Sequence, residues 1–194
     1  MKTLTAFAVP ACALALMALP ESSQAVYPTR PYEASWESQG PSGKVYATRF
    51  ATDGKGRGRS EMPGAGGNMR AAIADLKAKT VYVLLPEQKM ALKLPLKEEE
   101  MLGMTESLSP NKGKDLGVKV IDGHPCHGRL HDLGGTVAEI WTGDDIQVPV
   151  YSITTMSGYG KTVRRLKSYQ PTAPAAHAFV VPPSFRVVDG ARGM

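Results

Sequence analysis

The sequence predicts a mainly β fold built on antiparallel sheet, and three observations lead to this prediction. Short segments in which apolar and polar residues alternate follow one another along the chain, as in strands with one buried face. Turn-forming residues separate these segments, since the 194 residues include 20 glycines and 15 prolines. Only one short stretch has the composition of a helix. The expected class is therefore mainly β (α+β).

The first 25 residues have the pattern of a cleavable secretory signal peptide. Lys2 precedes an apolar run that ends before Pro20, and this run is too short to span a bilayer. Small residues at Ser23 and Ala25 predict cleavage before Val26. We therefore expect export to the periplasm and a single mature domain over residues 26–194.

Two alternatives apply to this N-terminal segment. It could instead form a buried helix of the folded protein. Cys12 could also carry a lipid, because Val9 to Cys12 loosely resembles a lipoprotein cleavage box, although Pro10 lies inside the box and the box comes too early. The order of charge, apolar run and small residues favours the cleaved signal.

Charge and cysteine content limit the partners of the mature chain. Its formal net charge of +5 favours anionic partners, including peripheral contact with an anionic membrane surface. Export and the scarcity of aromatic residues among the basic groups exclude nucleic acid. Loss of Cys12 would leave Cys126 alone, so no intrachain disulfide is expected, and we interpret its thiol as a small buried apolar group. No cofactor is expected.

The N-terminal half is expected to begin with a hairpin. Tyr32, Ala34 and Trp36 alternate with polar residues, and a second strand is predicted at residues 44–52. The glycine-rich residues 53–68 are predicted to form a long loop or a weak edge strand with a mobile tip.

Three further strands and one helix are expected before the middle of the chain. The strands are predicted at residues 71–75, 80–85 and 89–94, with turns between them, and Met90, Leu92 and Leu94 would share one face. Residues 97–104 form the best helical stretch, about two turns long.

The alternation in the second half of the sequence predicts further strands, which brings the expected number to about ten. Pro149 lies inside one of them, so that strand is expected at a sheet edge or with a bulge. The predicted strands are 118–121, 126–132, 136–141, 148–154, 162–169 and 178–181.

One cluster of residue types suggests a metal. His124, His127 and His131 surround Cys126, and zinc or copper accepts imidazole and thiolate ligands. On an extended strand, however, His127 and His131 would lie roughly 13 Å apart, and Cys126 would point to the other face. Exposed strand histidines beside a buried thiol are the simpler interpretation.

Other motifs do not support catalysis. Residues 158–162 end like a nucleotide-binding loop, but Thr155 stands where the first glycine belongs and no helix follows. No Gly-x-Ser-x-Gly elbow occurs, and Cys126 and His127 would project to opposite faces of a strand. The basic residues Lys161, Arg164, Arg165 and Lys167 are interpreted as solvated charge.

Three passages together resemble an exported bacterial family related to the periplasmic lipoprotein carriers (LolA/LolB-like). They are residues 80–92 (TVYVLLPEQKMAL), 138–150 (AEIWTGDDIQVPV) and 179–188 (FVVPPSFRVV). The resemblance implies a curved antiparallel sheet that forms an incomplete barrel, with one or a few short helices on the concave side and room for an acyl chain. It implies no catalytic residue.

The function expected from this resemblance and from export is non-enzymatic binding of a hydrophobic or amphiphilic ligand in the periplasm, with a lipid or a lipoprotein acyl chain as the ligand. The alternatives are a metal-binding envelope protein that uses Cys126 and its histidines, and an envelope-assembly scaffold that acts through a sheet edge such as the strand with Pro149. The apolar side chains expected to point inward, as core or as pocket lining, are Trp36, Tyr46, Phe50, Val81, Val83, Met90, Leu92 and Trp141.

Overall fold

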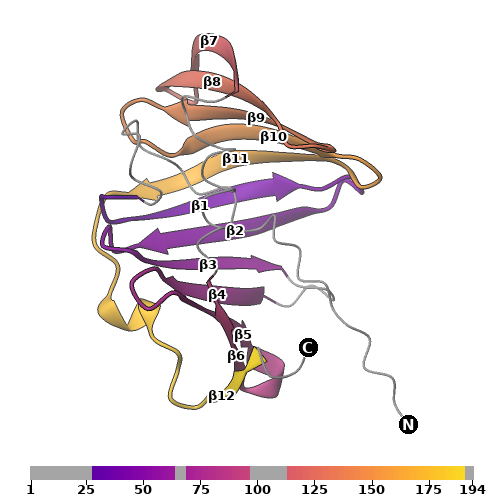
Figure 1. Ribbon diagram of the computed structural model, residues 1–194. Coiled ribbons are helices and arrows are strands. Elements are labelled where there is room, and N and C mark those ends of the chain that lie inside the picture. Colours follow the sequence, from indigo (N-terminus) through magenta and orange to yellow (C-terminus); the bar gives the residue numbers. More distant parts are fainter. Residues whose placement is uncertain (1–27, 64–68, 97–112, 191–194) are drawn as a thin grey trace.

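The computed structural model describes residues 28–63, 69–96 and 113–190, and these form one curved sheet of twelve strands (Figure 1). The strand order is β12-β6-β5-β4-β3-β2-β1-β11-β10-β9-β8-β7. The two end strands, β12 and β7, do not pair with each other, so the sheet is an incomplete barrel, as expected. Within the described ranges, no helix has the length and apolar character needed to cross a membrane.

The sheet consists of two meanders in which each strand pairs with the next along the chain. The first meander comprises β1 (Tyr32–Gln39), β2 (Val45–Thr52), β3 (Arg57–Pro63), β4 (Met69–Asp75), β5 (Thr80–Leu85) and β6 (Met90–Pro95). The second comprises β7 (Lys114–Ile121), β8 (His124–Asp132), β9 (Thr136–Gly143), β10 (Pro149–Met156) and β11 (Gly160–Gln170).

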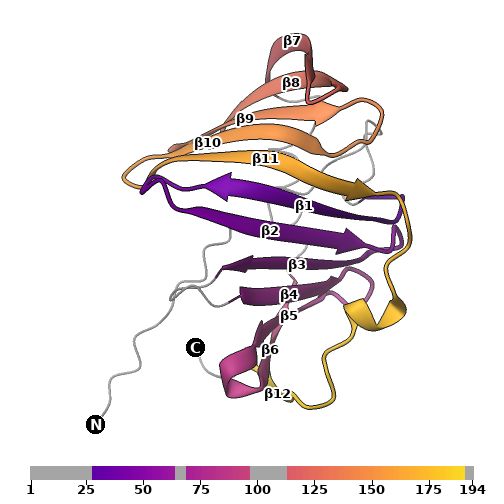
Figure 2. The same ribbon diagram turned by 180° about the vertical axis from the view of Figure 1, so that it is seen from behind.

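The two meanders join at the middle of the sheet. There β1, the first strand of the first meander, pairs antiparallel with β11, the last strand of the second (Figure 2). The register runs from Glu33 opposite Gln170 to Gln39 opposite Val163, with a bulge between Ser35 and Trp36. At the far end of the first meander, β12 (Arg186–Asp189) adds to β6 in the parallel direction. All other pairs are antiparallel.

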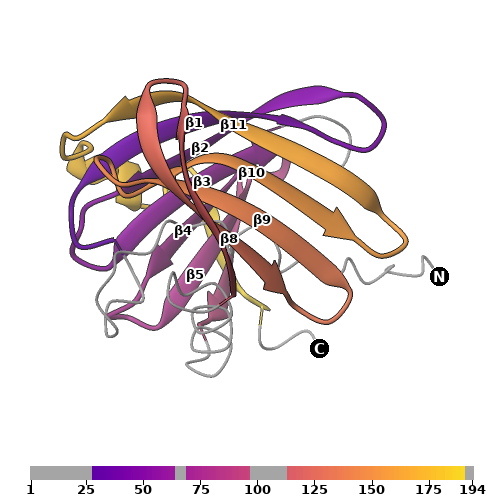
Figure 3. The same cartoon turned by 90° about the horizontal axis from the view of Figure 1, so that it is seen from above.

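The two faces of the sheet are named here after the tryptophan that each carries. On β1, buried Tyr32, Ala34, Trp36 and Ser38 alternate with more exposed residues, so these four define the Trp36 face. The opposite face carries Trp141 of β9 and is called the Trp141 face. Figure 3, a view along the stack of strands, shows the strong twist that turns the strands from one end to the other.

Both faces contribute to the core. On the Trp36 face, β1 and β2 pack with Val148, which precedes β10. On the Trp141 face, β4, β5 and β6 pack against Phe179 of η3 (Ala176–Phe179), a short 3₁₀ helix. At the other end of the sheet Cys126, Trp141 and Val150 form a third cluster.

Most expected strands are confirmed, including the hairpin of β1 and β2 and the meander of β4, β5 and β6. The turn between β5 and β6 is a 3₁₀ turn, η2 (Pro86–Gln88). Pro149 lies at a bulge, where the β9–β10 register shifts between Pro149 and Tyr151. The expected 97–104 helix and the predicted signal peptide lie outside the described residues.

The prediction of a loop or edge strand over residues 53–68 is wrong for residues 57–63. These residues form β3, which pairs with β2 on one side and β4 on the other. The glycines did not prevent a strand because a residue without a side chain still pairs through its backbone. Gly58 and Ser60 are small and buried, whereas Arg57 and Arg59 reach the other face and contact η3.

The prediction of a strand at residues 178–181 is also wrong. Ala178 and Phe179 belong to η3, and the backbone becomes extended only at Val180. The short strand β12 was not predicted. Its four residues carry a weak alternation signal, and its partner β6 is distant in sequence.

The contact between Gly128 and Trp141 allows a test of the packing on β8 and β9. A Cβ added at Gly128 would lie 2.7 Å from the indole ring of Trp141. We expect Gly128→Ala to lower the free energy of unfolding by about 1–3 kcal/mol, because the ring must shift. Gly40→Ala is the matched control, since its nearest neighbour is 3.8 Å away. Denaturant unfolding measures both, and equal stabilities would contradict the packing.

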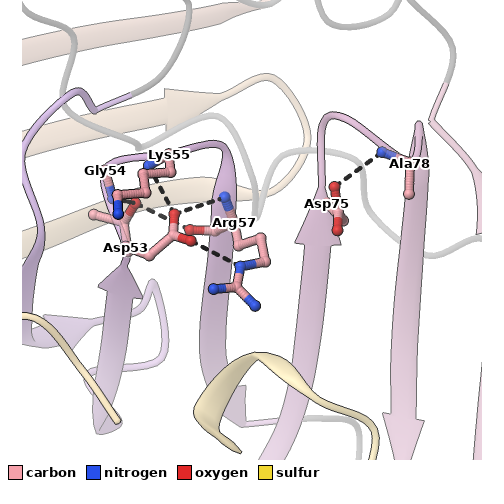
Figure 4. A network of polar contacts seen from close by, with 7 residues as sticks. Asp53, Gly54, Lys55, Arg57, Asp75 and Ala78 are labelled. Atoms are coloured by element: carbon pink, nitrogen blue, oxygen red, sulfur yellow. Dashed lines mark hydrogen bonds and ion pairs between the residues drawn. The ribbon is translucent and has the colours of Figure 1, made fainter. Parts of the chain in front are cut away.

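Asp53 organises the turn between β2 and β3 (Figure 4). Its Oδ1 accepts hydrogen bonds from the amides of Lys55 (2.7 Å) and Arg57 (3.0 Å), and its Oδ2 accepts one from Arg57 Nε (2.7 Å). Burial alone would raise the pKa of Asp53, but the hydrogen bonds from Arg57 and Lys55 outweigh it, so the pKa lies below its ordinary value.

This lowered pKa predicts a pH-dependent stability. The carboxylate stabilises the fold fully above the unfolded pKa of about 4, and the contribution is lost as the pH falls through the lower pKa of the folded state. We expect Asp53→Asn to cost about 1 kcal/mol near pH 7 and progressively less as the pH falls toward 2. Urea unfolding of both proteins across this range measures the difference, and a difference independent of pH would contradict the role of the charge.

Candidate ligand-binding face

Trp36 is the most buried aromatic side chain of its face, with 2% of its surface exposed. Its indole Nε1 donates a 2.7 Å hydrogen bond to the carbonyl oxygen of Pro149 on β10. The side chain therefore reaches from β1 across β11 to β10. The bulge at Pro149 interrupts the strand ladder at this point, and the indole satisfies the carbonyl there.

Seven of the eight predicted pocket residues share the Trp36 face. The strand registers place Ala34, Phe50, Ser60, Ala72, Val83 and Leu92 in one row across β1 to β6. Val81 lies in the neighbouring row, opposite Ala74, and Met90 lies two residues before Leu92. Tyr46 lies opposite Ser38 near the end of β1. Sequence alternation thus brings together Trp36, Tyr46, Phe50, Val81, Val83, Met90 and Leu92.

The eighth predicted residue, Trp141, lies on the opposite face. Across the strands, Trp141 lies opposite Tyr151, and Tyr151 lies opposite Arg165, so these three side chains share one face. The next residue of β11 in the N-terminal direction, Arg164, points to the other face, where it contacts Trp36. The ammonium group of Lys119 lies 3.5 Å from the centre of the Trp141 ring, and the indole donates a 2.6 Å hydrogen bond to Glu139. Trp141 is therefore left out of the proposed ligand face.

Arg164 of β11 is a cation on this face that the sequence interpretation missed. Its guanidinium carbon lies 4.0 Å from the centre of the Trp36 ring. Burial lowers the pKa of Arg164 to about 10, so the side chain stays charged at neutral pH. Its Nε is buried and has no hydrogen-bond acceptor in the described part of the chain, and the same holds for the hydroxyls of Thr48 and Ser60 on this face.

The alternation of residues along β11 is the sequence signal that could have placed Arg164 on the Trp36 face. Arg164 and Leu166 point to the face of Trp36, whereas Arg165 and Lys167 point away and form ion pairs with Asp122 and Glu37. The expectation of solvated charge is thus right for Arg165 and Lys167 and wrong for Arg164.

The predicted metal ligands do not meet. His124 Nδ1 lies 2.8 Å from Asp145, and His127 Nε2 lies 3.5 Å from Asp115. Cys126 is fully buried, and burial raises the pKa of its thiol. The alternation of β8 places His127 and His131 on the Trp36 face and Cys126 on the other. Among the described residues, no three His, Cys, Asp or Glu side chains are grouped closely enough to hold a metal ion.

The Trp141 face carries a different feature, a half-open hollow of about 390 Å³ over β11, β1, β2 and β3. Its lining includes Glu33, Arg49, Arg59 and Glu61, and Arg59 Nε lies 2.9 Å from Glu61. These charges make the hollow unsuitable for an acyl chain. The apolar Trp36 face is the better candidate for a hydrophobic ligand.

No protein-family model and no curated protein matches this sequence. Solved structures do resemble it. An uncharacterised conserved protein from Thermus thermophilus has a TM-score of 0.62 at 11% identity, and the alignment covers 83% of this chain and 91% of that one. The MucA/MucB complex from Pseudomonas aeruginosa contains a chain with a TM-score of 0.53 at 13% identity, with 83% of this chain and 59% of that chain covered.

At these identities the likeness concerns the fold alone. A LolA superfamily protein from Nitrosomonas europaea is also among the similar structures, with a TM-score of 0.40, 9% identity and coverage of 79% and 91% of the two chains. The curved antiparallel sheet, which does not close, agrees with the incomplete barrel that the sequence predicted.

Proposed function

We propose that this chain is a non-enzymatic periplasmic binding protein for a hydrophobic or amphiphilic ligand, namely a lipid or a lipoprotein acyl chain. The observation that carries the proposal is the row of six side chains on the Trp36 face, apolar except for Ser60, which runs from β1 to β6. Burial of an acyl chain against such a surface is favourable by about 0.8 kcal/mol for each methylene removed from water.

The degree of burial indicates where a ligand would enter. Trp36 and Phe50 are closed from solvent, with 2% and 6% of their surfaces exposed. Tyr46 is partly exposed, and so is Arg164 as a whole residue, although its Nε is buried. Tyr46 and Arg164 lie toward the end of the sheet where the β1–β2 and β10–β11 turns come together, at the right of Figure 1. A ligand head group would remain at this end while its tail extends along the face.

Export and charge support the proposed location. Residues 1–25 have the signal-peptide pattern, and the chain carries a net charge of +5 that favours approach to anionic lipid surfaces. The non-enzymatic role rests on the resemblance to the carriers.

The two alternative functions receive less support. The metal-binding role would need Cys126 and its histidines in one place, and β8 separates them onto two faces. The scaffold role named the strand of Pro149 as a free edge, but β10 lies between β9 and β11 inside the sheet. The free lateral edge of the second meander belongs to β7.

Tyr46 provides the test of the ligand face, because it is partly exposed and its loss should leave the fold intact. We expect Tyr46→Ser to weaken binding of a neutral amphiphile, 1-monopalmitoylglycerol, by roughly tenfold, since aromatic contact area is lost. Tyr151→Ser is the matched control, because Tyr151 is also partly exposed but lies on the Trp141 face.

Native mass spectrometry of the wild-type protein and both variants measures the bound amphiphile, and lipid extraction identifies anything already carried from the periplasm. Wild-type protein that arrives empty and also ignores added monopalmitoylglycerol would contradict the proposed function. Equal binding by wild type and Tyr46→Ser would place the ligand elsewhere.

A further inference from the structure

Arg164 differs from the other basic residues of β11. Arg165 forms a 3.1 Å ion pair with Asp122, and Lys167 lies 3.5 Å from Glu37, both in contact with solvent. Arg164 instead points between Ser38 of β1 and Ser152 of β10, which are both buried. Among the described residues, the titratable groups that act on its charge are the phenols of Tyr32 and Tyr46.

A buried guanidinium without a carboxylate is energetically expensive. A buried donor without an acceptor, such as Arg164 Nε, destabilises the folded state. The stacking on Trp36 offsets only part of this cost. In the described part of the chain, no anion completes the arrangement. An incoming oxyanion would satisfy both the charge and the free donor.

We propose that Arg164 binds the anionic head group of the ligand, so that the ligand is an amphiphile with one carboxylate or phosphate head and an alkyl tail. This inference rests on the proposed function. A guanidinium offers a planar set of donors that matches two oxygens of a carboxylate or phosphate. The indole of Trp36 holds this group at the inner side of the entry end.

The position of Arg164 suits such a ligand. From β11, the Trp36 face continues over β1 and β2 to β3, three strand spacings or about 14 Å. One acyl chain fills half of a bilayer core about 30 Å thick, which is a similar length. Along this path the tail would meet Trp36, Tyr46 and Phe50.

The test compares three amphiphiles with the same tail: palmitate, hexadecyl phosphate and neutral 1-monopalmitoylglycerol. We expect wild-type protein to bind at least one of the two anionic amphiphiles about tenfold more tightly than the neutral one, as one charge-assisted contact allows. Arg164→Gln should abolish this preference and keep the neutral affinity. Arg164→Lys should retain part of it, since the charge remains without the planar fork. Arg165→Gln is the matched control and should behave as wild type.

The outcomes separate this inference from the proposed function. Binding of all three amphiphiles with equal affinity by wild type, or an unchanged preference in Arg164→Gln, overturns the role of Arg164 and leaves lipid binding intact. Failure of wild type to bind any amphiphile overturns both. A preference for palmitate alone or for hexadecyl phosphate alone assigns the head-group chemistry. If Arg164→Gln does not melt cooperatively, wild type and Arg164→Lys decide the result. A wild-type preference for an anionic amphiphile that is weaker in Arg164→Lys supports the role of Arg164, and a preference that is unchanged in Arg164→Lys overturns it.

Discussion

The indole of Trp36 is the contact on which the rest of this structure depends. It is buried at the centre of the sheet, donates a hydrogen bond to the carbonyl of Pro149 and lies under the guanidinium of Arg164. These contacts tie β1 of the first meander to β11 and β10 of the second. Without the β1–β11 pairing, the chain would form two separate sheets, each with an additional open edge.

The same contact explains why the two faces differ in chemistry. On the Trp36 face, side chains from β1 to β6 form rows that are mostly apolar, and their buried polar members are small hydroxyl residues such as Ser38, Thr52 and Ser60. The centre of the Trp141 face instead carries paired charges, such as Arg59 with Glu61, that water can reach. An acyl chain is stabilised by the first surface and destabilised by the second. The proposed function follows from this asymmetry.

Sequence alternation predicted much of the fold because a strand's side chains change face at every residue. This rule places Tyr46 and Phe50 on the face of Trp36, and it separates Cys126 from His127. It fails across bulges, where one extra residue reverses the assignment. The bulges beside Trp36 and at Pro149 lie between the two tryptophans, so the face of Trp141 could not be predicted.

Other features depended on partners that are distant in sequence. Residues 57–63 form a strand because β2 and β4 enclose them, although their glycines and charges predict a loop. Arg164 could have been assigned from its spacing to Leu166, yet its importance becomes visible only when β1 brings Trp36 beneath it. Local sequence contains the alternation, whereas the site depends on which strands become neighbours.

The two tryptophans allow the most direct test of the central claim, because the chain has only two and each lies on a different face. The variant Trp141→Phe reports on Trp36 alone, and Trp36→Phe reports on Trp141 alone. Titration with a brominated fatty acid, whose bromine quenches indole fluorescence on contact, distinguishes the faces. Quenching of Trp36 with little effect on Trp141 is the predicted result. Quenching of Trp141 while Trp36 stays bright would contradict the assignment of the ligand to the Trp36 face.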